Sequence, residues 1–175
     1  MNQYSKRMVI VHWLTLALLV IAYFLGDSLD EARHEGGVTT LAYLVHSLVG
    51  AAVLLLVALR LNFRRVDGTP PPLGDALMDR VAIGVHYLLY VVLVMLPVSG
   101  VALVLSSGVG KAVLSGDASL LPAKYTGVSS LPHNVHELLV SVLMLLVALH
   151  VLGALKHQFL MKDGLIARMS LKRNS

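Results

Sequence analysis

Four apolar segments of similar length constrain this sequence more than any other feature. They lie near residues 8–26, 40–60, 81–105 and 134–157. A helix needs about 20 apolar residues to cross the hydrocarbon core of a bilayer. Because every backbone polar group in that core must be bonded within the protein, such segments fold as helices. The sequence therefore predicts an all-α, four-helix transmembrane bundle that forms a single domain over residues 1–175.

The composition supports a membrane protein and narrows its chemistry. Hydrophobic residues make up 57% of the chain and charged residues 14%, with a mean hydropathy of +0.77, well above that of a soluble domain. The absence of cysteine excludes iron–sulfur clusters, thiolate metal sites and covalent c-type haem attachment as internal features. Any metal must therefore bind to the eight histidines or to carboxylates.

The distribution of charge predicts the topology. Segment 27–39 is acidic, whereas basic residues gather in segment 60–80 and near both termini. The positive-inside rule then places both termini and segment 60–80 on the cytoplasmic side of a bacterial inner membrane. The formal charge of +4 follows from this topology, so we expect membrane lipid around the protein and no nucleic-acid partner.

Two further segments are expected to cover the ends of the bundle. Connector 106–133 is long, rich in Gly and Ser, and carries Lys111 and Lys124 as its only basic residues. We expect it to lie as a cap over the outer ends of the helices, because a loop of this length is usually functional. The tail after Asp163 is expected to form a short interfacial helix, with Leu165, Ile166 and Met169 on one side.

The histidines sort into two depths. His136 and His150 are fourteen residues apart, about four helical turns, so they share one face about 21 Å apart. Imidazoles buried at two depths of a bilayer are costly without a partner, and iron in two haems is the leading candidate. The outer level offers one pair, His46 with His136. The inner level offers three candidates, His12, His86 and His150, for two axial positions.

Simpler interpretations of these residues remain open. A lone histidine in a membrane helix more often bonds a neighbouring helix, but four at two matched depths favour ligation. Gly50 and Gly153 would leave room for a porphyrin, or they are ordinary small-residue helix contacts. His34 and His133 lie in the outer connectors, and we expect both to be solvated loop residues.

Another class of protein would use intramembrane histidines differently. A transporter with a histidine proton relay should also carry carboxylates in its spans. Apart from Glu137, at the end of the last segment, these are nearly absent. An electron carrier is therefore the favoured class.

Several stretches resemble one family closely. They are YSKRMVIVHW at the start, the pair His46 and Gly50, Arg60 followed by TPPP, HYLLYVVLVMLPVSG from His86, HE at His136, and LHVLGALKHQFLMKDGLIARM near the end. Together they cover nearly the whole chain. As a set, they resemble the bacterial cytochrome b561 family, four-helix dihaem b cytochromes related to the cytochrome b subunits of nickel–iron hydrogenases and formate dehydrogenases.

The resemblance implies a ligand set. It implies two haems b, each held by two of four histidines: His12 with His150 at the inner level, and His46 with His136 at the outer level. His86 would then lie beside the inner haem, near its propionates or a quinone. Arg80 and His157 would be its neighbours, although His157 could instead be an interfacial anchor.

The resemblance also implies an activity. In the family's best-defined free-standing reaction, an electron from superoxide outside passes through both haems to ubiquinone, without a covalent intermediate on any residue. Lys111 and Lys124 could attract the anion, or they are plain solvated charges. The alternatives are a membrane cytochrome b subunit of a multi-subunit dehydrogenase or hydrogenase, which would need a protein partner, and a carrier without catalytic activity of its own.

Overall fold

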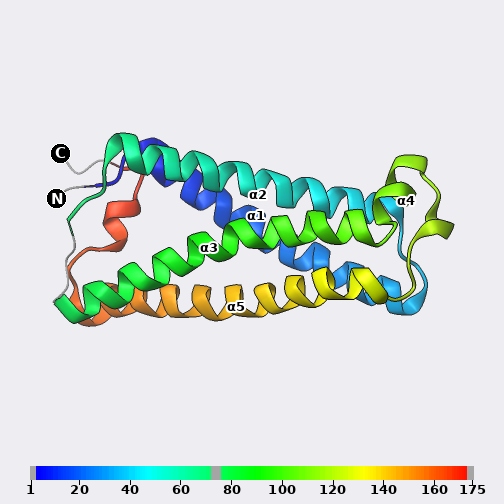
Figure 1. Cartoon of the computed structure of the whole chain (residues 1–175). Coiled ribbons are helices and arrows are strands. Elements are labelled where there is room, and N and C mark those ends of the chain that lie inside the picture. The colour runs from blue at the N-terminus through cyan, green and yellow to red at the C-terminus, as the bar shows by residue number, and fades with distance from the viewer. Residues whose placement is uncertain (1–2, 72–75, 173–175) are drawn as a thin grey trace.

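Long antiparallel helices dominate the computed structural model, which describes residues 3–71 and 76–172 (Figure 1). The four longest helices are α1 (Lys6–Glu35), α2 (Thr40–Asp67), α3 (Ala76–Ser106) and α5 (Ser130–Leu155). Helix α1 packs on α2, α2 on α3, and α3 on α5. In the described residues, four helical segments are long and apolar enough to cross a membrane. The predicted all-α transmembrane bundle is thus confirmed.

The helices extend beyond the apolar segments that predicted them. Helix α1 passes through Gly26 and ends at Glu35, where Gly36 adopts the left-handed conformation with φ of 79°. Helix α2 continues to Asp67, and Gly68 has φ of 72°. The predicted ends near residues 26 and 60 were therefore too early. Hydropathy marks the buried part of a helix, whereas a capping residue decides where the helix stops.

The connector between α3 and α5 forms a folded cap. It contains α4 (Val109–Ser115) and the short 3-10 turns η1 (Ala118–Leu120) and η2 (Gly127–Ser129). Helix α4 packs against α2 and α3. Its Val109 joins Leu29 of α1 and Tyr43 of α2 in a buried apolar cluster. We call this end of the bundle the cap end.

Both termini lie at the opposite end, which we call the terminal end (Figure 1). After α5 the chain continues as a π-helix, η3 (Lys156–Met161), and a 3-10 turn, η4 (Ile166–Met169). The expected interfacial helix is therefore a single turn. Two hydrogen bonds join this turn to the N-terminal region. The indole N–H of Trp13 donates to the backbone carbonyl of Met169 at 3.1 Å, and the backbone N–H of Tyr4 donates to the backbone carbonyl of Arg168 at 3.1 Å.

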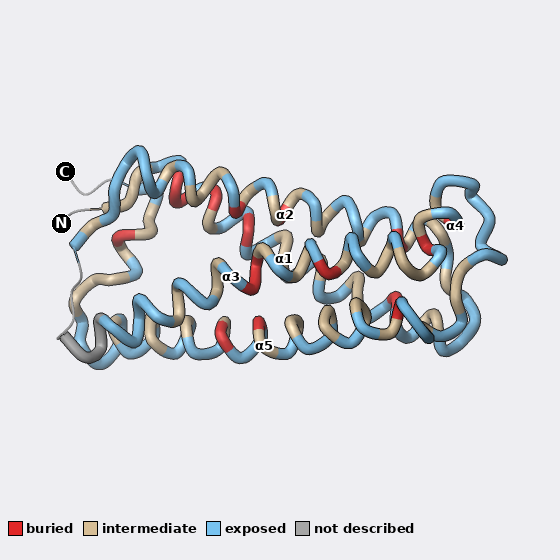
Figure 2. The backbone as a smooth tube through the Cα atoms, viewed as in Figure 1, coloured by how far each residue is buried: buried red, intermediate tan, exposed pale blue. Residues whose placement is uncertain are grey.

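The apolar core lies midway between the two ends. It consists of three pairs of buried side chains from α2, α3 and α5: Val53 and Val57, Val92 and Leu93, Leu143 and Leu146. Figure 2 shows that buried positions are few and that exposed ones cover the outside of the bundle. In a chain that spans a membrane, these exposed apolar side chains face lipid.

Candidate functional site

Helix α5 presents one face to the interior along its whole length. His136, Leu143 and His150 follow one another at intervals of seven residues, and Leu143 between the two histidines is buried. The leucines two positions further on are exposed by 61–63%: Leu138, Leu145 and Leu152. Both histidines of α5 therefore point into the bundle, one toward each end, as their spacing predicted.

At the cap end, His136 meets His46 of α2. Their ring centroids are 6.3 Å apart. Nδ1 of His136 lies 3.0 Å from the hydroxyl of Ser99, and that hydroxyl donates to the carbonyl of Leu96 at 2.7 Å. A hydroxyl has one proton to donate, so it accepts from Nδ1–H of His136. This arrangement leaves the Nε2 lone pair of His136 available to a metal.

Each cap-end histidine rests against a glycine of a neighbouring helix. A Cβ added to Gly26 of α1 would lie 3.3 Å from Cε1 of His46, and one added to Gly100 of α3 would lie 3.4 Å from Cε1 of His136. Nδ1 of His46 is buried near the carbonyl of Ala22 without a hydrogen bond of regular geometry. These glycines make room for the imidazole rings.

Gly50 and Gly153, which the sequence suggested as space for a porphyrin, have no atom within 4 Å of an added Cβ. Open space there agrees with a porphyrin and with a simple helix contact alike. Ser99, Gly26 and Gly100 were not singled out as site residues, because their role depends on contacts between helices. A serine and a glycine side by side at the depth of His136 were the available signal.

At the terminal end, three histidines from three helices come together. The ring centroids of His12 and His150 are 6.2 Å apart, and those of His86 and His150 are 5.1 Å apart. Nδ1–H of His86 donates to the carbonyl of Ala82 in its own helix at 2.7 Å. All three inner-level candidates therefore lie in one cluster.

The ring separations test whether a haem iron fits between two imidazoles. A metal–imidazole bond is about 2.0–2.1 Å long, and the centre of a five-membered ring with bonds near 1.33 Å lies about 1.1 Å from each atom. Two axial rings on opposite sides of an iron should then have centroids about 6.2–6.4 Å apart. The separations of 6.2 Å for His12 and His150 and 6.3 Å for His46 and His136 fit, whereas 5.1 Å for His86 and His150 is too short.

The donor set also suits a haem better than a bare metal ion. In the part of the chain that the structure describes, no group of three or more His, Asp or Glu side chains could hold a metal ion. Two imidazoles alone do not complete a metal site, but they complete one in which a porphyrin supplies the remaining ligands. The assignment of the four ligands stays a prediction that this geometry supports.

Arg60 of α2 is a site residue that the sequence analysis used for topology and for the family resemblance, but not for the site. Its Nε donates to the hydroxyl of Tyr90 at 3.0 Å. Its positive charge acts on the rings of His12, His86 and His150. An arginine at the edge of an apolar span was the signal that could have singled it out.

His157 and Arg80, the other proposed neighbours of the terminal-end cluster, have different surroundings from each other. His157 donates from Nδ1 to a carboxylate oxygen of Asp163 at 2.6 Å, and both side chains are less than 20% exposed. Burial opposes the charge on Asp163, but hydrogen bonds from His157 and from the backbone N–H of Leu165 hold the pKa of Asp163 below its ordinary value. Arg80 is exposed, and it makes no hydrogen bond or ion pair with described residues of the cluster. Asp163 was missed because its contact with His157 follows the left-handed conformation of Lys162, which the sequence does not indicate.

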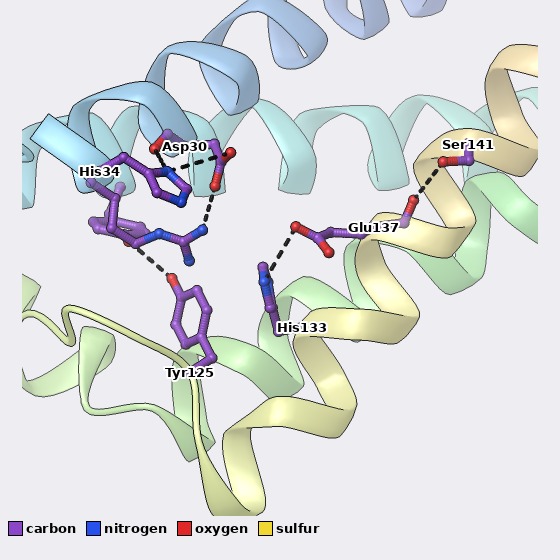
Figure 3. A network of polar contacts seen from close by, with 8 residues as sticks. Asp30, His34, Tyr125, His133, Glu137 and Ser141 are labelled. Atoms are coloured by element: carbon purple, nitrogen blue, oxygen red, sulfur yellow. Dashed lines mark hydrogen bonds and ion pairs between the residues drawn. The ribbon is translucent and has the colours of Figure 1, made fainter.

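A polar network lies at the cap end (Figure 3), where Tyr43 precedes His46 and His133 precedes His136 by about one helical turn. The hydroxyls of Tyr43 and Tyr125 lie 2.9 Å apart. The ring of Tyr125 contacts that of His133 with centroids 4.4 Å apart and an interplanar angle of 42°. The guanidinium of Arg33 pairs with Asp30. It also lies over the ring of Tyr125, 4.7 Å from the ring centroid.

We expected His34 and His133 to be solvated loop residues. Neither residue lies in a loop, and His133 is not solvent-exposed either. Both lie in helices, His34 in the last turn of α1 and His133 in the first turns of α5. The side chain of His133 is only 20% exposed and lies 3.2 Å from Glu137, because the folded cap covers it. Lys111 and Lys124 are both exposed at the cap end.

Fold and site together define a class. The chain is a four-helix membrane protein with two pairs of interior imidazoles, one toward each end of the bundle, spaced to hold iron between them. Comparison with known sequences agrees: residues 3–171 match the family described as prokaryotic cytochrome b561. The chain belongs to this family, whose members are membrane electron-transfer proteins that bind b-type haem.

Several curated relatives are similar over their whole length. Cytochrome b562 of Cereibacter sphaeroides is 29% identical over 97% of this chain and 96% of its own. Cytochrome b561 homolog 1 of Escherichia coli (strain K12) is 28% identical over 99% of each chain. A protein of Yersinia pestis named "Probable superoxide oxidase CybB" is 28% identical over 98% of each chain.

Proposed function

We propose that this protein binds two haems b and carries electrons through the membrane from superoxide at the cap end to ubiquinone at the terminal end. The observation that carries this proposal is the pair of ring separations, 6.2 and 6.3 Å, which recur at two levels of one bundle. Haem, when bound, supplies reversible one-electron chemistry of its iron. The name of the relative from Yersinia pestis supports superoxide as the donor.

The chain's own residues hold and separate the two centres. His46 and His136 would hold the cap-end iron, and His12 and His150 the terminal-end iron. The buried core formed by α2, α3 and α5 lies between the two levels. It keeps water and protons out of the space between the centres, so that only electrons pass.

The topology assigns a substrate to each end. Basic residues gather at the terminal end, and the positive-inside rule then supports a cytoplasmic terminal end and a periplasmic cap end in a bacterial inner membrane. Superoxide is an anion and must be met outside, where Lys111 and Lys124 attract it. Oxidation of two superoxide ions to dioxygen releases two electrons, and one quinone takes up these two electrons and two protons to become quinol.

The terminal end carries a route for one of these protons. Asp163 accepts the Nδ1 proton of His157, which leaves Nε2 of His157 available for exchange with a quinone oxygen. His86 keeps its own Nε2 free beside His150, because its Nδ1 is bonded to a carbonyl. Both imidazoles are therefore assigned to quinone reduction and not to iron.

Proteoliposomes with the loaded protein and ubiquinone test the proposal. Superoxide generated outside as the sole donor should reduce the quinone faster than in protein-free liposomes. Replacing Lys111 and Lys124 with Gln should slow the reaction more at low than at high ionic strength, because salt already screens the attraction. A rate no higher than the spontaneous one would instead favour a membrane subunit of a larger dehydrogenase, with a protein donor.

A further inference from the structure

Arg60 is a cation at the terminal-end edge of an apolar span. It lies in α2, in a helical segment apolar enough to cross the membrane, and its side chain is half-buried. Its hydrogen bond is to the hydroxyl of Tyr90, and no ion pair joins it to a carboxylate whose side chain the structure describes. Arg33, by contrast, pairs with Asp30. A half-buried charge at this depth is costly, and it marks a functional position.

The hydrogen bond to Tyr90 directs Arg60 toward the terminal-end cluster. Tyr90 follows His86 by one helical turn on α3, so the two side chains lie on the same face. The ring of His86 is in turn 5.1 Å from that of His150. Arg60 therefore faces the cluster from α2, and its charge acts on both histidines that would hold the terminal-end iron.

The cap-end pair has no such charge beside it. Among the described residues, no charged side chain acts on His46, and only the rings of His46 and His133 act on His136. Nearby charged groups are paired, Arg33 with Asp30 and His133 with Glu137. The two levels of the bundle are thus alike in ring geometry but unlike in charge.

We propose that Arg60 makes the terminal-end haem the stronger electron acceptor of the two and so directs electrons from the cap end to the terminal end. This inference rests on the proposed two-haem function. Reduction adds one negative charge to a haem, and a nearby cation stabilises the reduced form. One electron leaves the cap-end haem, which is oxidised, and reaches the terminal-end haem, which is reduced; no bond forms or breaks and no proton moves.

The size of the effect follows from Coulomb's law. A unit charge about 10 Å away, at an effective dielectric constant of about 20, changes the equilibrium for electron sharing by about tenfold or more. The Nη groups of Arg60 also match the carboxylates of haem propionates in charge and shape. Arg60 therefore contributes both to the potential of the terminal-end haem and to its anchoring.

Potentiometric titration of the full-length, haem-loaded protein in detergent tests the inference. Dissolved mediators supply the electrons, and a His136→Ala variant assigns the two waves by removing the cap-end haem. In Arg60→Gln the terminal-end midpoint potential should fall, so that electron sharing shifts about tenfold toward the cap-end haem. Arg60→Lys, which keeps the charge, should stay close to wild type. Arg65→Gln, an exposed arginine on the same helix, is the matched control and should change neither wave.

An unchanged terminal-end potential in Arg60→Gln with both haems bound would overturn the inference. If Arg60→Gln loses the terminal-end haem, Tyr90→Phe is the deciding variant, because it keeps the charge of Arg60 and removes the hydrogen bond that directs Arg60 toward the cluster. A smaller fall in the terminal-end potential supports the inference, and an unchanged potential overturns it. Haem content is measured first, since one haem per chain would overturn the two-haem proposal itself. A failure of superoxide to act as donor would not affect these titrations.

Discussion

Replacing Gly26 with alanine should weaken the cap-end haem without unfolding the protein. The added Cβ would lie 3.3 Å from Cε1 of His46 and 3.8 Å from its Nδ1. Carbon atoms in contact prefer about 3.5–4.0 Å, so the ring must move by a few tenths of an ångström. This movement changes the distance between the ring centroids of His46 and His136. That distance is 6.3 Å, which is the value that two axial ligands of one iron require.

Two effects of this substitution oppose each other in stability. Alanine in a helix is more favourable than glycine by about 1 kcal/mol, whereas an extra methyl group in a tight contact costs about 1–3 kcal/mol. The free energy of unfolding should therefore change little. Haem affinity at the cap end depends on the tight contact with His46 and not on the helix preference. A cost of about 1–2 kcal/mol there corresponds to about a 5–30-fold loss of haem affinity.

Haem titration into the apoprotein measures this loss. A His150→Ala background, expected to lack the terminal-end haem, isolates binding at the cap end. Gly100→Ala, where the added Cβ would lie 3.4 Å from His136, should have a smaller effect. Gly84→Ala is the matched control, because it is a helical glycine with no atom within 4 Å of the added Cβ. Unchanged cap-end affinity in Gly26→Val, which adds two more methyl groups, would refute the reasoning.

Two further predictions concern the terminal end. His86→Ala should keep both haems and slow quinone reduction, whereas His12→Ala should lose one haem. Haem content and the reduced spectrum distinguish the two variants. The opposite pattern would mean that His86, and not His12, pairs with His150. Asp163→Asn should slow quinone reduction without changing haem content, because His157 loses its anionic partner. Since the folded-state pKa of Asp163 is lowered, its contribution to stability is full at neutral pH and lost as the pH falls through that pKa, so the thermal unfolding midpoints of variant and wild type should converge in acid.

The number and type of helices followed from the sequence because the bilayer imposes one length on every span. The helix ends did not follow, since Gly36 and Gly68 stop their helices well beyond the apolar segments. Depth in the membrane also followed from position in the chain, and depth alone was enough to pair His46 with His136, whose rings do meet at the cap end.

The direction in which a side chain points around its helix is harder to predict. His12 and His86 lie at similar depth, and only the packing of three helices gives their different separations from His150. Contacts between helices likewise decide the roles of Ser99 beside His136 and of Tyr90 beside Arg60. Such partners are far apart in the chain and leave no local spacing to detect.

One helix, α5, supplies a histidine to both proposed ligand pairs, and it is the last of the long helices in the chain. During synthesis, α1, α2 and α3 enter the membrane first and carry one histidine of each pair without its partner. Neither haem can then be held from both sides until α5 has been inserted. If the four histidines hold two haems as proposed, cofactor loading is a late event in biogenesis, and a nascent chain arrested before residue 130 would hold neither haem by two axial ligands.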